Sequence, residues 1–431
     1  MTSPAVLIPT RHASGWWLPG AAAAADWLRR QVKPGARVVL RGAPSPALAA
    51  LIQGAWAAGV CLIPINRRLT AAEAAPLLQR ATPDLVLDGV LPDFSGSGDP
   101  GRDDHDPTSA AVVLFTSGTT GAPKAVRLSR RALRASAAAA CVRLGLTADD
   151  AWCACLPLDH IGGISTLLRA HLAGFRLHLH ERFDAAAISA DLDSGATGAS
   201  LVPTMLHRLA QRDRPWDPRV RVLLIGGGPL DRRLAERSRD LGCAPCQTYG
   251  LTECASQVCT LAPDEAADGL GTAGTPLAGM EVSLTREGAI RVRGSALMDG
   301  YEGLPDPCDA DGWFTTGDLG SFDAAGRLTV LGRHDEVIVS GGEDIAPHEI
   351  EAVLERHPGI REAAVYGEPD PEWGMRVCAV LVPSGEVLSA GELAAACAPL
   401  ADFRRPKTWR WAQELPRTAL GKLRRARLRN G

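Results

Sequence analysis

The sequence predicts an α/β protein built as a large N-terminal domain followed by a small C-terminal domain. Over the first 270 residues or so, short β-branched or Leu-rich runs alternate with Ala/Leu/Arg segments of helical length, which indicates layered, mainly parallel sheets flanked by helices. From about Gly269 the strands become shorter and Gly and Asp more frequent, which predicts a barrel-like or antiparallel β subdomain. After residue 346 a new helix and strand begin a small α+β domain. We place the domains at 1–333 and 334–431.

The predicted strands of the large domain are short apolar runs, most of which close on Gly or Pro. In chain order they occupy residues 37–42, 59–66, 84–89, 110–117, 198–204 and 220–228. Helices are predicted between several of them, at 68–80, 129–144 and 229–241.

The longest uncharged stretch, Ala47 to Ile65, is about long enough to span a bilayer. Because it contains Gln53, Gly59 and Pro64, we predict a helix that ends at Gly59 and a buried strand after it, with no membrane contact. Further along, strands are predicted within 281–294 and 326–333, a helix opening at Pro347, and a strand at 361–367.

Composition narrows the classes of function. The 431 residues carry a net charge of -3, so no broad basic surface for nucleic acid is implied, and a small or nucleotide-sized ligand fits better. Eleven scattered cysteines, without a signal-like N-terminus, suit a reducing cytoplasm, and we interpret Cys243 and Cys246 as ordinary buried thiols. Only four of the 46 basic residues are lysines, at 33, 124, 407 and 422, so Lys124 and Lys422 attract attention.

The segment "VVLFTSGTTGAPKAVRLS", residues 112–129, carries hydroxyls, glycines and Lys124 directly after a predicted strand. Such a loop offers backbone N–H groups and side-chain donors to an anion, and phosphate is the usual one. Its spacing fits neither the P-loop nor the dinucleotide glycine motif. Taken alone, the loop is a phosphate-binding candidate, and a plain polar turn is the alternative.

Four further segments lead to a family. "TSGTTGAPK" resembles the phosphate loop of the adenylate-forming superfamily of acyl-CoA synthetases, aryl-CoA ligases, luciferases and adenylation domains. "QTYGLTE" (247–253), "GWFTTGD" (312–318), "GRHDEVIVSGGEDIAPHEIE" (332–351) and "PRTALGK" (416–422) resemble its remaining signatures, in the same order. Within the superfamily, "PLDHIGGISTLLR", "ASLVPTMLHRL", "LLIGGGPL" and "YGLTECASQVCT" are most similar to the o-succinylbenzoate-CoA ligases of menaquinone synthesis.

The resemblance implies a two-step ligase. ATP would activate a carboxylic acid as an acyl-adenylate with release of pyrophosphate, and coenzyme A would then displace AMP. The cofactors implied are ATP, Mg²⁺ and coenzyme A as co-substrate; the sequence leaves a homodimer open. The residues implied to hold the nucleotide are Thr116, Ser117, Gly118, Thr119, Thr120, Gly121, Lys124, Gly227, Tyr249, Gly250, Asp318 and Arg333.

Particular roles follow from the same resemblance. Tyr249 would lie against adenine, Thr252 would reach the α-phosphate and Glu253 would hold Mg²⁺. Asp318 and Arg333 would bind the ribose, and a structural salt bridge is the alternative for that pair.

The resemblance also implies a catalytic lysine and a hinge between the two domains. Lys422 would be the catalytic lysine that stabilises charge on the α-phosphate, the alternative being a solvated basic residue. Asp335 would be the hinge at which the small domain rotates, unless it is a solvated turn carboxylate.

The acid pocket is expected around His160, Arg169 and Ser200. The acid has two carboxylates, and Arg169, on a helix predicted to start near Gly163, would bind the one that is not activated. Ser200 could donate to the same group, and His160 would line the pocket wall. The alternatives are an exposed helix arginine for Arg169 and a core histidine for His160.

Other functions stay open. An aryl- or fatty-acyl-CoA ligase would need a pocket without a fixed cation. A catalytically silent acyl-nucleotide sensor would be expected to lack Asp335 or Lys422, and both are present. The sequence departs from the family at "GGEDI", where Asp344 adds a carboxylate, and neither Asp344 nor Cys254 is assigned a role.

Overall fold

The chain folds into two compact units. The structure, a computed structural model, describes residues 4–94, 96, 98–101, 104–116, 123–333, 336–340, 343–345, 347–370, 373–400, 402–417 and 423–430. The first unit comprises Met1–Val282 and Val292–Phe314, and the second comprises Ser283–Arg291 and Thr315–Gly431. The predicted domain boundary at residue 333 lies further along the chain than Thr315, where the main segment of the second unit starts. The boundary stays a prediction.

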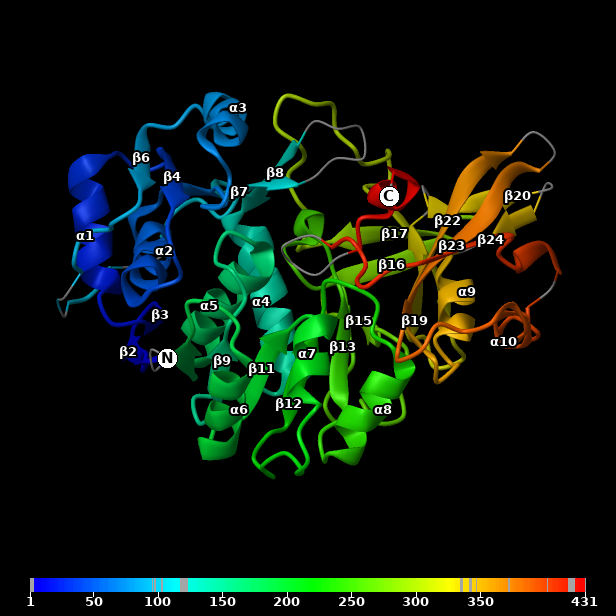
Figure 1. The fold of residues 1–431 in the computed structure, drawn as a ribbon. Helices are drawn as coiled ribbons and strands as arrows, with labels where there is room; N and C mark the ends of the chain where they lie inside the picture. The colour runs from blue at the N-terminus through cyan, green and yellow to red at the C-terminus, as the bar shows by residue number, and fades with distance from the viewer. Residues whose placement is uncertain are drawn as a thin grey trace. The chain divides into compact units, whose positions relative to one another are not determined.

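A five-stranded sheet forms the N-terminal part of the first unit, in the order β6-β4-β5-β7-β8 (Figure 1). Its strands are β4 (Arg37–Arg41), β5 (Cys61–Pro64), β6 (Leu85–Asp88), β7 (Ala110–Thr116) and β8 (Lys124–Ser129). The helices of this part are α1 (Ala21–Gln31), α2 (Pro46–Ala58) and α3 (Ala71–Ala81). All neighbouring strands run parallel except β7 and β8, which form an antiparallel hairpin. That hairpin presents the predicted phosphate loop at its tip.

An eight-stranded sheet forms the rest of the first unit, in the order β1-β10-β9-β11-β12-β13-β14-β15. Its strands are β1 (Ala5–Leu7), β9 (Ala151–Ala154), β10 (Arg176–Leu179), β11 (Gly198–Leu201), β12 (Val222–Ile225), β13 (Pro245–Tyr249), β14 (Cys259–Thr260) and β15 (Thr275–Pro276). The helices here are α4 (Arg130–Leu144), α5 (Ile161–Ala173), α6 (Ala185–Ser194), α7 (Pro203–Leu209) and α8 (Arg232–Asp240). β2 (Thr10–His12) and β3 (Gly15–Trp17) form a separate hairpin.

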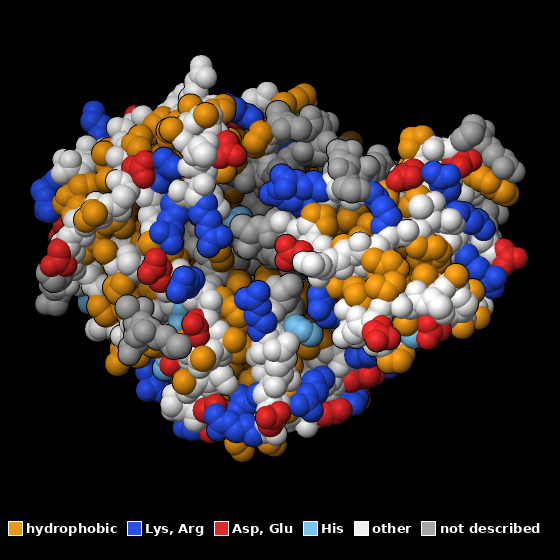
Figure 2. Space-filling model, in the orientation of Figure 1, with side chains coloured by type: hydrophobic (Ala, Val, Ile, Leu, Met, Phe, Trp, Pro, Cys, Tyr) orange, Lys and Arg blue, Asp and Glu red, His pale blue; other side chains and the backbone are white. Residues whose placement is uncertain are grey.

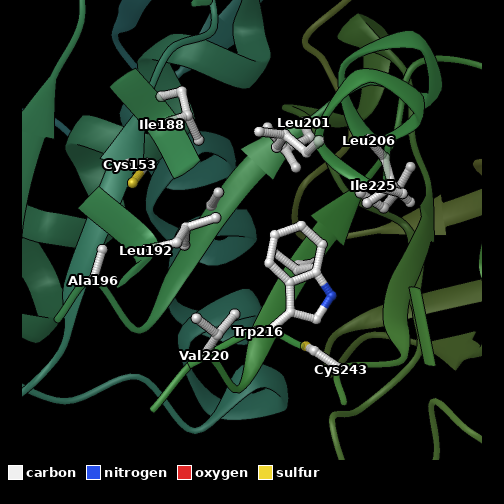
Figure 3. Close-up of a cluster of buried hydrophobic side chains, with 14 of the residues drawn as sticks. Cys153, Ile188, Leu192, Ala196, Leu201, Leu206, Trp216, Val220, Ile225 and Cys243 are labelled. Carbon is white, nitrogen blue, oxygen red and sulfur yellow. The ribbon is translucent and has the colours of Figure 1, made fainter. Parts of the chain in front are cut away.

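The two faces of this sheet have different partners. Side chains of α6, α7 and α8 pack on one face against Cys153, Leu201 and Ile225, and Figure 3 shows this cluster around Trp216. The opposite face holds Trp152 and Ser200, whose side chains are hydrogen-bonded to each other and lie beside α5. Because strand side chains alternate between faces, neighbouring residues of β9 serve different layers.

The second unit contains most of the antiparallel structure. One sheet has the order β16-β17-β18-β19, with β16 (Met280–Leu284), β17 (Ala289–Gly294), β18 (Phe314–Phe322) and β19 (Leu328–Arg333). The division between the units passes through β16 and β17 and after the first residue of β18. The other has the order β21-β20-β23-β22 with β24 beside β23: β20 (Ile338–Ser340), β21 (Glu343–Ile345), β22 (Ile360–Asp370), β23 (Gly374–Pro383) and β24 (Thr408–Trp411). α9 (Pro347–Leu354) and α10 (Ala390–Ala396) contribute to its core.

The α/β fold class and the predicted elements are confirmed. All six predicted strands of the first unit are present, and the three predicted helices match α3, α4 and α8 within about three residues at each end. The uncharged stretch is a helix that ends at Gly59, which takes the left-handed conformation (φ 73°), followed by buried β5. Gln53 is buried in that helix because its amide oxygen accepts from Leu18 N (2.7 Å).

Two surface properties bear on partners. Lys and Arg side chains and Asp and Glu side chains are both spread over the face shown in Figure 2, as the near balance of charge suggests. Among the described residues, no helix combines the length and the apolar character needed to cross a bilayer.

An ion pair between the buried carboxylate of Asp150 and the partly exposed Arg221 supports the loop before β9. Asp150 is buried and accepts from Arg221 Nε (3.0 Å), Thr197 Oγ1 (2.7 Å) and Thr147 N (2.9 Å). Burial alone would raise the pKa of Asp150. The hydrogen bonds outweigh burial, the one from Arg221 most of all, and bring the pKa below its ordinary value. The carboxylate therefore stabilises the fold above the unfolded pKa of about 4, and this contribution is lost as pH falls through the lower folded pKa.

We predict that Asp150→Asn lowers the free energy of unfolding by about 1–3 kcal/mol at neutral pH, because Arg221 loses its anionic partner. Urea unfolding at neutral and acidic pH measures this, and the difference from the wild type should shrink below about pH 4. The exposed neighbour Asp149 is the matched control, and Asp149→Asn should change little. A loss that persists undiminished in acid would contradict the assignment.

Candidate functional site

The base of the predicted phosphate loop is the β7–β8 hairpin. Thr116, the last residue of β7, pairs with Lys124, the first residue of β8, and the Thr116 hydroxyl donates to the Lys124 carbonyl (3.5 Å). Of the predicted loop residues, Ser117, Gly118, Thr119, Thr120 and Gly121 lie outside the described residues. The antiparallel pairing thus fixes where the loop leaves and re-enters the sheet.

Lys124 and Glu253 are brought together by a tyrosine that the sequence analysis did not single out. Lys124 Nζ lies 4.8 Å from the centre of the Tyr301 ring, and the Tyr301 hydroxyl donates to Glu253 Oε1 (2.9 Å). Tyr301 also forms a β-bridge with Val126 of β8. The predicted phosphate lysine and the predicted metal carboxylate therefore contact the same side chain.

Glu253 fits the role of a magnesium ligand. Its side chain is half-buried, and the Tyr301 hydroxyl uses one lone pair of one carboxylate oxygen, which leaves the remaining lone pairs to a cation. Mg²⁺ is commonly held by one or two carboxylates together with phosphate oxygens. The Glu253 carbonyl accepts from Met298 N (2.8 Å), which ties this turn to the segment that carries Tyr301.

The turn after β13 carries Tyr249, Gly250, Thr252 and Glu253 in an unusual backbone conformation. Tyr249 ends β13 and is buried, and a short 3₁₀ turn, η1 (Thr252–Cys254), follows. The next two residues, Ala255 and Ser256, have positive φ angles of 51° and 114°. Such angles are costly for residues other than glycine and are concentrated at functional sites.

Gly250 allows this turn to fold back on itself. A Cβ at Gly250 would lie 1.6 Å from the Ser256 carbonyl oxygen, so no side chain fits there. Gly227, the other predicted nucleotide glycine, follows β12 with a φ of 80°.

Arg169 lies in the interior of the first unit, so the alternative of an exposed helix arginine is wrong. Only 1% of its surface is exposed. Its guanidinium donates to Gln257 Oε1 (2.7 Å), Thr166 Oγ1 (2.9 Å) and Ser200 Oγ (3.0 Å), and it lies 5.6 Å from the Trp152 ring centre. The predicted neighbour Ser200 is therefore present, and its hydroxyl supports Arg169.

No acidic side chain of the described residues pairs with the Arg169 guanidinium. The partners are neutral, three of its five N–H donors are used, and Nε is buried without a hydrogen bond. Burial lowers the pKa of Arg169 to about 10, so the group stays charged at neutral pH. A buried cation with spare donors is suited to an anionic ligand.

Gln257 orients the guanidinium from the far side. Its amide nitrogen donates to Thr260 Oγ1 (2.8 Å) and Thr248 Oγ1 (3.4 Å), so its oxygen is turned toward Arg169. The buried amide thus links the turn after β13 to α5. His160 is the N-cap of α5 and is half-buried; it lies about 13 Å before Arg169 along the helix axis.

In the second unit, Asp318 and Arg333 face each other across β18 and β19. Their side chains form an ion pair of 3.4 Å (Arg333 Nη1 to Asp318 Oδ1), with 18% and 40% of the side chains exposed. The pair is accessible rather than buried, so the salt bridge does not prevent it from also binding hydroxyl groups. The predicted hinge residue Asp335 lies outside the described residues.

The predicted catalytic residue Lys422 also lies outside the described residues, but the segment around it is fixed at both ends. Arg417 and Leu423 form an antiparallel bridge, and Arg424 N donates to the Pro416 carbonyl (2.7 Å). Arg425 is held by Glu336 (Nε to Oε2, 2.8 Å) and Glu351 (Nη2 to Oε2, 2.9 Å). Arg425 is therefore tied into the fold.

The residues missed by sequence reasoning are polar groups whose partners are distant in the chain. Tyr301 could have been suspected as Lys124 was, because the chain has only three tyrosines. Gln257, Thr166 and Trp152 carry no such signal. Cys254 is fully buried and burial raises its pKa well above the ordinary value, so no role for a reactive thiolate follows.

The chain matches a known family over most of its length. Residues 20–302 match the family model described as AMP-binding enzyme, and residues 349–422 match that of the AMP-binding enzyme C-terminal domain. The 2-succinylbenzoate–CoA ligase of Bacillus pumilus is 35% identical to this chain, covering 93% of this chain and 88% of the relative.

Solved structures are similar over nearly the whole chain. The o-succinylbenzoate CoA synthetase of Bacillus subtilis in complex with the acyl-adenylate intermediate OSB-AMP has a TM-score of 0.86 and 30% identity, covering 96% of this chain and 92% of that one. The same synthetase with ATP and magnesium ion has a TM-score of 0.85 and 30% identity, covering 95% and 93%.

We predict that Gly250→Ala destabilises the first unit by about 1–3 kcal/mol, because the Ser256 carbonyl must move to admit the methyl group. Thermal unfolding is the measurement. Gly228→Ala is the matched control, since a Cβ there meets nothing closer than Pro203 at 3.9 Å and the residue lacks a positive φ. Equal shifts for the two variants would count against a tight turn at Gly250.

Proposed function

The chain belongs to the AMP-binding enzyme family, and from this premise we propose that it is an ATP-dependent 2-succinylbenzoate–CoA ligase of menaquinone biosynthesis. In the first step a carboxylate oxygen of the acid attacks the α-phosphorus of ATP and pyrophosphate leaves. In the second step the coenzyme A thiol attacks the acyl carbon, its proton is lost and AMP leaves. Adenylation thereby converts a carboxylate oxygen, which is a poor leaving group, into part of AMP, which is a good one.

The observation that carries the proposal is the buried Arg169 guanidinium. It is held by Gln257, Thr166 and Ser200, and it has spare N–H donors. An acid with one carboxylate to activate needs no such group. An acid with a second carboxylate does, because that carboxylate must be recognised inside the protein, where an unpaired charge is costly. This favours 2-succinylbenzoate over a simple benzoate or a fatty acid.

The remaining predicted residues take the nucleotide in this proposal. Mg²⁺ supplies charge neutralisation to the phosphates, and Glu253, held by Tyr301, is its protein ligand. Thr116, Lys124 and Ser117 to Gly121 bind the outer phosphates, Thr252 the α-phosphate, and Gly227, Tyr249 and Gly250 border the adenosine. Asp318 and Arg333 are the residues proposed for the ribose.

Two parts of the proposal rest on sequence alone. Lys422 stabilises the charge that develops on the α-phosphate, and a hinge at Asp335 lets the small domain, from residue 334, serve both steps. A cytoplasmic location belongs to the proposal in the same way, whereas the sequence leaves a homodimer open. The alternative of an aryl- or fatty-acyl-CoA ligase would leave the Arg169 cation without a purpose. A catalytically silent acyl-nucleotide sensor would not need the Lys422 ammonium, because it would have no transition state to stabilise.

We expect pyrophosphate release to be fastest with o-succinylbenzoate in a screen that also contains benzoates, coumarate and fatty acids.

Arg169→Met should raise the KM for o-succinylbenzoate by about thirty- to a thousandfold, equivalent to about 2–4 kcal/mol, and leave the KM for ATP nearly unchanged. The reason is the loss of the cation that binds the second carboxylate.

Arg130→Met is the matched control for this variant. Arg130 is also buried and stacked on a tryptophan, 4.9 Å from the Trp56 ring centre, but it lies on α4. Its loss should affect stability without changing the preference among acids. Gln257→Glu is a second test of the same site. It places a carboxylate beside Arg169, which should compete with the second carboxylate of the substrate and raise the KM for o-succinylbenzoate. If Arg169→Met raised both KM values equally, Arg169 would not belong to the acid pocket.

We predict that Lys422→Ala slows adenylate formation by about a hundred- to a thousandfold, or about 3–4 kcal/mol, because transition-state charge is no longer stabilised. Thioester formation from supplied acyl-adenylate should continue. Stopped-flow measurement of each half-reaction separates the two, and Lys407→Ala is the control lysine. A parallel fall of both half-reactions would argue against separate conformations for the two steps.

A further inference from the structure

A second polar cluster lies on the opposite face of the eight-stranded sheet from Arg169. It consists of Cys153 of β9, His178 and His180 at the end of β10, and Asp191 of α6. Cys153, His180 and Asp191 are buried, and the ligand-type atoms of these three lie within 4.8 Å of one another. Neither the family resemblance nor the proposed ligase chemistry gives these residues a role.

Strand register builds the cluster. Cys153 and His178 are direct partners in the parallel pair of β9 and β10, so their side chains point to the same face of the sheet. His180, two residues further, points the same way, and its backbone N–H donates to the Ala154 carbonyl (3.0 Å). α6 covers this face and brings in the Asp191 carboxylate.

The hydrogen bonding of this cluster is incomplete. His180 Nε2 lies 2.7 Å from Asp191 Oδ2, and His178 Nδ1 lies 3.3 Å from the same oxygen. His178 Nδ1 is nevertheless buried without a hydrogen bond of acceptable geometry. A single carboxylate oxygen thus faces two imidazole nitrogens, and no hydrogen bond is found for the Cys153 sulfur within the described residues.

The surroundings favour a bound ion over a water network. Cys153 belongs to an apolar cluster, and Figure 3 shows its sulfur near Ile188 and Leu192 of α6. Buried polar groups in such surroundings are normally fully paired. A cation between the sulfur, the imidazoles and the carboxylate would complete the pairing of all four groups.

We propose that Cys153, His178, His180 and Asp191 bind one divalent transition-metal ion, with Zn²⁺ as the best match to this mixed set of sulfur, nitrogen and oxygen ligands. Tetrahedral zinc with these ligands has ligand atoms about 3.3–3.8 Å apart, so the 2.7 Å contact between His180 and Asp191 must open by less than about 1 Å. The Cys153 thiol proton and any imidazolium proton are released on binding.

The proposed ion is structural. Cys153, His180 and Asp191 already lie close enough to share an ion, whereas His178 touches only Asp191 and must move inward to become the fourth ligand. With His178 in place, four protein ligands close a tetrahedral site and leave no position for substrate or water. The ion would tie α6 to β9 and β10, and it is distinct from the Mg²⁺ proposed at Glu253. Its presence can therefore be tested with the metal alone, without any assay of ligase activity.

The test is to titrate chelator-treated full-length protein with Zn²⁺ and, separately, with Co²⁺. We expect one zinc per chain by elemental analysis, a rise in melting temperature, and a thiolate-to-cobalt charge-transfer absorption that reports sulfur coordination. Cys153→Ser and Asp191→Asn should each weaken zinc binding by more than about a hundredfold. Cys246→Ser is the matched control, because Cys246 is a buried cysteine of β13 in the same sheet, and it should bind zinc as the wild type does.

The decisive measurement on the wild type does not depend on any variant folding. Absence of the cobalt charge-transfer absorption, or absence of stoichiometric zinc, would overturn the proposal and leave a plain His–Asp pair. Binding that survives equally in Cys153→Ser and Asp191→Asn would also overturn it, because the metal would then be held elsewhere. If Cys153→Ser does not fold, the cobalt spectrum of the wild type still tests sulfur coordination. His180→Gln then replaces Cys153→Ser as the variant expected to bind zinc more weakly.

Discussion

A positive charge buried between α5 and the eight-stranded sheet, that of Arg169, is the constraint on which the surrounding polar contacts depend. Taking a guanidinium out of water costs several kcal/mol, and neutral oxygens compensate for that cost only in part. Ser200 must therefore face α5, and Gln257 must be locked by Thr260 so that its amide oxygen meets Arg169. The strained turn after β13 carries both Gln257 and Glu253, so one backbone conformation positions the partner of Arg169 and the carboxylate proposed to bind Mg²⁺.

The two loops expected to act on ATP are supported in the same manner although they belong to different units. The first leaves the sheet at Thr116 and returns at Lys124, and the second leaves at Arg417 and returns at Leu423. Each is closed at its base by antiparallel pairing of the described residues on either side. The points at which both predicted loops leave and rejoin the fold are therefore set by backbone pairing.

Much of the fold could be predicted because local signals agreed with the tertiary structure. The run around β5 is β-branched and closes on Pro64, and Gly59 ends the preceding helix through a left-handed cap that few other residues adopt readily. The motifs likewise singled out Lys124 and Glu253, and the resemblance singled out Arg169; the roles of these three residues stay predictions. The burial of Arg169 and the contacts of Tyr301 could not be predicted, because they arise from residues that are brought together only when the sheets pack. Nothing local to Gln257 distinguishes it from a surface glutamine.

The alternation of side chains along β9 has a consequence for how this chain can vary. Trp152 faces the arginine and Cys153 faces the histidines, and the two residues are adjacent. Insertion or deletion of a single residue in this strand would exchange the two faces and dismantle both clusters in one event. Divergence among descendants of this sequence should accordingly proceed by replacement within β9, while its length stays invariant.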